Sequence, residues 1–192
     1  LTMGEFCGST GEECVTALVI GYDIHARLGE AMNPAMYRER GIDATGVCGS
    51  VAVAAVAGRL MGRSEEQIAN AMGIASLFTG AFTEYQNDGT SGKYLCTGWA
   101  CLSGVRAATL AKAGFTGPIE ALEGKKGYFQ GLRGSRLELG NVLKDLKKDF
   151  KINAVYLKQH ACMRGLHAGV DAMLKLREKY GLTVDNVDHI EV

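Results

Sequence analysis

Proline is scarce in this sequence, and neither an excess of one charge nor a long hydrophobic run is present. Only 2 prolines occur among 192 residues, and 21 basic residues balance 21 acidic ones. Without a dense block of either sign, the chain lacks the electrostatic footprint of a protein that binds nucleic acid or an anionic membrane. The longest apolar runs, such as residues 51–57, are too short to cross a bilayer, and no secretory signal opens the chain. We therefore expect a cytoplasmic protein with a small-molecule or protein partner.

Cysteine is present but not in the spacing of a metal site. The six cysteines include no C-x-x-C pair, and four of them fall in apolar helical stretches, where cysteine behaves as a small hydrophobe. This usage predicts reduced thiols in a cytoplasm and argues against structural zinc.

Glycine, in contrast, is abundant, with 26 residues, close to twice the average share. In residues 45–62 and 96–114 glycine and alanine recur at helical spacing within segments that are apolar nearly all round. Small residues at that spacing let helix backbones approach closely, so we expect tightly packed, buried helices.

The hydrophobic periodicity predicts a run of helices with short connections. Ser64 to Gln67 has the form of a capping box, which marks the start of one of them. The predicted helices of this part span residues 12–30, 46–61, 64–78 and 94–113. Residues 115–132 are predicted to form turns and one-turn helices, and residues 138–150 a short helix and an exit strand.

After about residue 150 the pattern changes. We expect a short strand at residues 152–157, an amphipathic helix over residues 163–180, a turn at Gly181 and a strand from Val187 onward. The predicted fold class is therefore mainly α, with an all-helical part followed by a βαβ segment that opens a small α+β domain.

The segment NDGTSGKYLCTGWACLSG, residues 87–104, is the strongest candidate for a site. A turn rich in glycine and hydroxyl groups delivers Lys93 to the start of an apolar helix, where free backbone N–H groups favour an anion. The helix dipole and partial burial would also pull the lysine pKa toward neutrality. A solvated surface lysine is the plain alternative. The segment is not a Walker A loop, because Asn87 and Tyr94 stand where that motif needs a glycine and a serine or threonine.

Five segments in succession carry a resemblance to a known family. They are GYDIHARLG, RGIDATGVCGSVAVAAVAGRLMG, SEEQIANAMGIAS, residues 87–129, and LKQHACMRGLHAGVDAMLKL. In this order they resemble the MmgE/PrpD family, which includes 2-methylcitrate dehydratase, cis-aconitate decarboxylase and iminodisuccinate epimerase.

The resemblance implies a large helical domain and a smaller α+β domain, with the active site in the cleft between them. It also implies a homodimer and no metal or organic cofactor. Residues 1–149 would belong to the helical domain, incomplete at its N-terminus, and residues 150–192 would begin the α+β domain.

The resemblance also assigns site residues. Lys93 falls on the lysine of the family's NDGSMTK-like motif, with Asp88 and Ser91 of that motif as further substrate-binding candidates. Lys158 falls on the lysine that opens the family's KPYPCCR-like motif, and Arg164 on the arginine that closes it.

Three departures accompany these matches. Asp43 stands where the family's GFHPTG motif has its histidine, and Cys96 stands where a histidine often follows the first lysine. The Tyr and Pro positions of the second motif are occupied by Gln159, His160 and Ala161. Asp43 could replace the missing base or could simply cap a helix, and His160 is a second candidate base, with an exposed or core histidine as its alternative.

Two functions are compatible with these residues. The first is a lyase or isomerase, or a fragment of one, that acts on a polycarboxylate such as 2-methylcitrate by metal-free proton abstraction, with Lys93, Lys158 and Arg164 as the cations. The second is a catalytically inactive, truncated or diverged member of the family that serves as a dimerising helical module.

Overall fold

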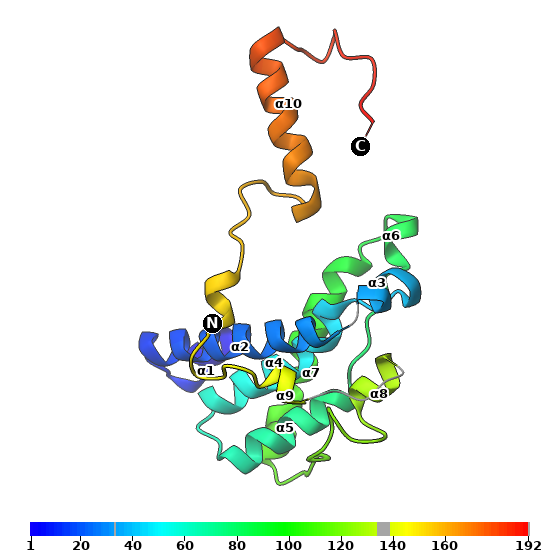
Figure 1. Ribbon diagram of the computed structural model, residues 1–192. Coiled ribbons are helices and arrows are strands. Elements are labelled where there is room, and N and C mark those ends of the chain that lie inside the picture. Colours follow the sequence, from blue (N-terminus) through cyan, green and yellow to red (C-terminus); the bar gives the residue numbers. More distant parts are fainter. Residues whose placement is uncertain (33, 134–138, 192) are drawn as a thin grey trace. The chain divides into compact units, whose positions relative to one another are not determined.

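A computed structural model describes residues 1–32, 34–133 and 139–191 (Figure 1). The chain divides into two compact units, residues 1–154 and 155–192, and each is described by itself. The elements of the first unit are α1 (Thr2–Cys7), α2 (Gly11–Ala31), α3 (Pro34–Arg40), α4 (Ala44–Leu60), α5 (Glu65–Leu77), α6 (Tyr85–Asp88), α7 (Gly92–Lys112), α8 (Tyr128–Arg133), α9 (Leu139–Val142) and the 3-10 helix η1 (Lys151–Ala154).

The four long helices predicted from the periodicity are confirmed as α2, α4, α5 and α7, with ends within two residues of those expected. The capping box is confirmed as well. The hydroxyl of Ser64 accepts a hydrogen bond from the backbone N–H of Gln67 at 3.2 Å, and the Gln67 side chain accepts one from the N–H of Ser64 at 3.3 Å. The same device starts α2, where Thr10 and Glu13 cap each other.

Helix α4 forms the centre of the first unit and packs against α2, α5 and α7 (Figure 1). Its side chains Val47, Cys48 and Val51 are almost completely buried. Close packing depends on small residues, as predicted: a Cβ atom placed on Gly104 of α7 would lie 2.6 Å from Cβ of Val53 on α4. The dense contact of these helices offsets the poor helix propensity of glycine.

A buried ion pair that the sequence did not reveal lies on α2. The side chain of Arg27 donates to the Asp23 carboxylate at 2.8 Å, and both residues are buried. The same guanidinium donates to the backbone carbonyls of Val142, Lys144 and Asp149 at 2.7–3.0 Å. A single arginine thus fixes a segment more than 110 residues away in the chain onto the helical unit.

The second unit consists of the 3-10 helix η2 (Arg164–Leu166), helix α10 (His167–Tyr180) and irregular segments. The helix predicted for residues 163–180 is confirmed in these two elements, and Gly181 ends it in the left-handed conformation at φ 65°. Residues 155–163 and 182–191 are extended or turn-like and form no strand.

The predicted strands are wrong. Residues 144–148 form turns, residues 151–154 form η1, and the described part of the 187–192 segment pairs with no other strand. Glu138, at the start of the expected short helix, lies outside the described residues, and α9 forms just after it. Among the described residues, the one β-type pairing is an isolated bridge between Ile42 and Phe82. A strand is stable only beside a partner strand, and the described part of the second unit offers none.

None of the helices in the described part of the chain is long and apolar enough to span a membrane.

Candidate functional site

The side chains of Asp43, Tyr85 and Lys93 meet at one carboxylate oxygen. The Lys93 ammonium nitrogen and the Tyr85 hydroxyl each donate to Oδ2 of Asp43 at 2.7 Å. The other oxygen, Oδ1, accepts the backbone N–H of Thr45 at 2.9 Å, so Asp43 is the N-cap of α4. Asp43 is only 3% exposed, whereas half of the Lys93 side chain is exposed. A buried carboxylate therefore holds a lysine whose side chain is still half exposed.

The antiparallel bridge between Ile42 and Phe82 places Asp43 beside the segment that leads to Tyr85. Across this bridge the backbone N–H of Asp43 donates to the carbonyl of Ala81 at 3.0 Å. The entry to α4 and the entry to α6 are thereby fixed side by side.

Helix α7 supplies the lysine, and a glycine lets it approach. Gly92 is the first residue of α7, and a Cβ atom at that position would lie 2.9 Å from Cβ of Tyr85. Any larger residue would push the tyrosine away from the start of the helix. As a result, the Lys93 ammonium lies 5.7 Å from the centre of the Tyr85 ring while it bonds to Asp43.

These contacts fix the protonation states of the cluster. Burial by itself would raise the pKa of Asp43, but the hydrogen bonds from Lys93, Tyr85 and Thr45 and the lysine charge outweigh it, so the pKa lies below its ordinary value. Burial would lower the pKa of Lys93, but the bonds to Asp43 and Tyr85 and the Asp43 charge raise it. The pKa of Tyr85 is raised by burial and by its bond to Asp43. At neutral pH the cluster holds a carboxylate, an ammonium and a neutral phenol.

The expectation that the pKa of Lys93 shifts toward neutrality is therefore wrong. The helix N-terminus and partial burial both favour a lower pKa for Lys93. Asp43 has the opposite effect, and it lies 50 residues earlier in the chain, outside the local pattern. Lys93 is suited to hold an anion or to donate a proton, rather than to accept one.

Asp88 and Ser91 lie next to this cluster in the chain. Both are exposed, Asp88 at the end of α6 and Ser91 at the N-cap of α7. The Ser91 side chain makes no capping hydrogen bond, and no ion pair involves Asp88 in the described part of the chain. Their assignment to substrate binding stays a prediction.

The other predicted site residues belong to the second unit. Lys158 is exposed, and the guanidinium of Arg164 lies 4.5 Å from the centre of the Tyr156 ring. His160 contacts a carboxylate, with 2.7 Å between its Nε2 atom and Oδ1 of Asp171. The structure thus brings Asp43 together with Lys93, and gives His160 and Arg164 partners of their own within the second unit.

Tyr85 and Asp171 are polar partners that the sequence reasoning missed. No local signal points to Tyr85, which lies 42 residues from Asp43 and meets it only through the fold. Asp171 did carry a signal, because it stands four residues after His167 and so shares its face of α10.

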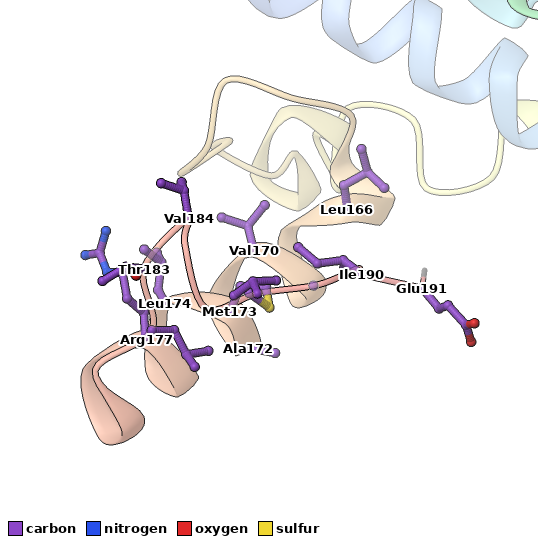
Figure 2. Close-up of a pocket in the computed structure, with 13 residues that line it drawn as sticks. Leu166, Val170, Ala172, Met173, Leu174, Arg177, Thr183, Val184, Ile190 and Glu191 are labelled. Carbon is purple, nitrogen blue, oxygen red and sulfur yellow. The ribbon is translucent and has the colours of Figure 1, made fainter.

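A groove of about 990 Å³ also lies in the second unit (Figure 2). Its walls come from α10 and from the segment after it, and they include Val170, Met173, Val184 and Ile190. The charged residues in its lining are Arg177 and Glu191, one of each sign. This groove is apolar, and it contains none of the predicted site residues, so it does not suit a polycarboxylate.

No group of three or more His, Cys, Asp or Glu side chains that could hold a metal ion occurs within the described ranges.

Comparison with known proteins agrees with this architecture. The family model of the MmgE/PrpD N-terminal domain matches residues 1–138, and the chain belongs to the MmgE/PrpD family. One relative is the cis-aconitate decarboxylase-like protein oryM of Aspergillus oryzae, 29% identical over 177 residues, which are 89% of this chain and 36% of that protein. Another is a cis-aconitate decarboxylase of Aspergillus terreus, 24% identical over 194 residues, with 95% of this chain and 39% of that protein covered. The chain thus spans less than two fifths of the length of these relatives.

Proposed function

We propose that this chain is part of a lyase that acts on a tricarboxylate or dicarboxylate by proton transfer next to a carboxylate group, with no metal or organic cofactor. The observation that carries the proposal is the Lys93 ammonium, held 2.7 Å from the buried Asp43 carboxylate with half of its side chain exposed. Membership of a family whose relatives include cis-aconitate decarboxylases supports the lyase class.

Lys93 acts in this proposal as a fixed cation. One of its three N–H groups bonds to Asp43 and another interacts with the Tyr85 hydroxyl, so the third can bond to a substrate carboxylate. Removal of a carboxyl group or of an adjacent proton builds negative charge on the substrate. A cation that is already oriented stabilises that charge without reorganising during the reaction.

Similarity to cis-aconitate decarboxylases favours cis-aconitate as the substrate, and 2-methylcitrate is the second candidate. In a decarboxylation the bond from carbon to the carboxyl group breaks, CO2 leaves with neither bonding electron, and the remaining carbanion takes a proton. Lys93 is suited to donate that proton or to stabilise the carbanion. In a dehydration a base must instead remove a proton from carbon while hydroxide leaves as water.

The second unit offers two further candidate cations, Lys158 and Arg164. An arginine can grip a carboxylate in a bidentate manner, and its guanidinium is already oriented by the Tyr156 ring. His160 is proposed as the base, since Asp43 has its oxygens bonded by Thr45, Tyr85 and Lys93.

The experiment is a turnover assay of the full-length protein with cis-aconitate and with 2-methylcitrate, in buffer stripped of metal ions and followed by proton NMR of the products. We expect turnover of one acid, and a fall in kcat/KM of about 100-fold or more in Lys93→Met. The control is Lys112→Met, at the exposed other end of the same helix. Loss of activity in both variants, or in neither, would contradict the role of Lys93.

A second candidate function is favoured by one observation. Helix α7 exposes a row of large apolar side chains, with Tyr94 82%, Leu95 71% and Trp99 53% exposed. Such a face suits self-association, so the alternative is a non-catalytic module that dimerises through its helices. The turnover assay separates the two, because the module would convert neither acid.

A further inference from the structure

His160 and Asp171 form a hydrogen-bonded pair in the second unit. Nε2 of His160 lies 2.7 Å from Oδ1 of Asp171, which projects from the second turn of α10. About a quarter of the His160 side chain and half of the Asp171 side chain are exposed. The pair therefore lies at the surface of the unit but is not fully hydrated.

A second histidine supports the ring of His160. The rings of His160 and His167 meet edge to face, with centres 5.1 Å apart and an angle of 69° between their planes. His167, the first residue of α10, is buried, with 6% of its surface exposed. The ring of His160 is thus held by a carboxylate at Nε2 and by a buried neighbouring ring.

The pairing dictates which ring nitrogen carries the proton. The hydrogen bond with His160 lowers the pKa of Asp171, and the charges of His160, Lys175 and His167 act in the same direction, against a smaller effect of burial. An ionised carboxylate only accepts hydrogen bonds, so Nε2 must be the donor. In the neutral ring the lone pair then resides on Nδ1, and within the described residues no hydrogen bond involves that atom.

We propose that Asp171 is a positioning residue that holds His160 in the tautomer with a proton on Nε2, so that Nδ1 is free to take a proton from a substrate carbon. This proposal rests on the proposed function, since it assigns a base to the dehydration that the proposed function includes as its second candidate reaction. In the step, the C–H bond breaks, its electron pair stays on carbon, and the proton moves to Nδ1. The resulting imidazolium is stabilised by the Asp171 carboxylate.

The first test needs no catalytic activity. In protein labelled with 15N-histidine, long-range proton–nitrogen correlation spectra at alkaline pH report which nitrogen is protonated in each neutral ring. The signals of His160 are identified by their loss in His160→Gln. We expect a single tautomer with Nε2 protonated in the wild type, and averaging between both tautomers in Asp171→Ala and Asp171→Asn.

The matched control is Asp185→Asn, an exposed aspartate without a histidine partner, which should leave the His160 signals unchanged. Averaged tautomers in the wild type, or an unchanged single tautomer in folded Asp171→Ala, would overturn the proposal. Circular dichroism melts of each variant show that the comparison is made on folded protein.

The second test is kinetic and uses the full-length protein. We expect Asp171→Asn to lower kcat by about 100-fold with little change in KM, and the double variant with His160→Gln to be no worse than His160→Gln alone. Additive losses, or an unchanged kcat, would overturn the positioning role. If Lys93→Met still abolishes turnover in that case, the proposed function survives and only the assignment of the base fails.

Discussion

The ammonium nitrogen of Lys93 lies 2.7 Å from Oδ2 of Asp43, although 50 residues separate the two in the chain. Asp43 occupies the position at which the resemblance to the family places a histidine. A carboxylate at that position raises the pKa of the lysine, whereas a neutral imidazole would not add that charge.

Removal of the Tyr85 hydroxyl should weaken the cluster without breaking it. Tyr85→Phe deletes one of three hydrogen bonds to Asp43, so we expect the free energy of unfolding to fall by about 1 kcal/mol. The pKa of Asp43 should rise toward its ordinary value, because one of the groups that lower it is gone. Denaturant unfolding and carbon NMR titration of the carboxylate measure the two effects. Tyr94→Phe, at an exposed position, is the control and should change neither.

Asp43→Ala and Asp43→Asn should separate the helix cap from the charge. Asparagine can still cap α4 through its oxygen, so Asp43→Asn should lose the bonds that Oδ2 accepts from Lys93 and Tyr85 but keep the cap, while Asp43→Ala should cost about 1 kcal/mol more. Unfolding of both variants in urea gives this difference. Equal stability of the two variants would show that the cap contributes nothing.

The stability difference between wild type and Asp43→Asn should depend on pH in a defined way. Because the folded pKa of Asp43 is lowered, its contribution is present above the unfolded value of about 3.8 and is lost as the pH falls through the lower folded pKa. Because the folded pKa of Lys93 is raised, its contribution is present below about 10.5 and is lost as the pH rises through the higher folded pKa. Melting curves should show a constant difference from about pH 7 to about pH 9. Below that range His25 also contributes, because burial lowers its pKa below the ordinary 6.5 and the Asp43 charge opposes that shift. A difference that varies strongly between about pH 7 and about pH 9 would contradict the assigned protonation states.

The buried Arg27 should be the most sensitive charged residue of the helical unit. Arg27→Ala leaves Asp23 buried without its partner and releases three backbone carbonyls, so we expect a loss of about 3–5 kcal/mol of unfolding free energy. Arg106→Ala, on the exposed side of α7, should cost less than about 0.5 kcal/mol. Similar losses in both variants would show that the contacts of Arg27 do not stabilise the fold.

The chain should self-associate through its helical part, and we expect a homodimer. The apolar face of α7 offers Leu95 and Trp99 to a partner copy, so Leu95→Glu should shift the protein toward monomer. Sedimentation velocity at micromolar concentration measures both states. Asp88→Glu, also at an exposed position, should leave the distribution unchanged. A wild-type protein that is monomeric at every concentration would contradict the predicted homodimer.

The helices could be predicted from the sequence because their signals are local. The capping box at Ser64 and the small-residue periodicity of α4 and α7 act within one helix or between adjacent helices. The expected strand from Val187 failed, because a strand depends on a partner elsewhere in the chain, and an alternating pattern does not supply one.

The candidate site was predictable only in part for the same reason. Lys93 and Asp43 could be singled out by the motifs around them, but their contact, and the part played by Tyr85, depend on the bridge between Ile42 and Phe82. The direction of the Lys93 pKa shift follows from that contact. No pattern within one segment encodes a pairing across 50 residues.

If Lys93 is the anchored cation of a polycarboxylate site, cis-aconitate should stabilise the folded protein through that residue, and a thermal melt at increasing cis-aconitate concentration measures this. A ligand that binds only the native state raises the melting temperature. At a ligand concentration 100 times its Kd, the free energy of unfolding increases by about 2.7 kcal/mol. We predict such a rise for the wild type and for Lys112→Ala, and loss of most of it in Lys93→Ala. An equal rise in wild type and Lys93→Ala, or no rise in the wild type at any concentration, would contradict the account.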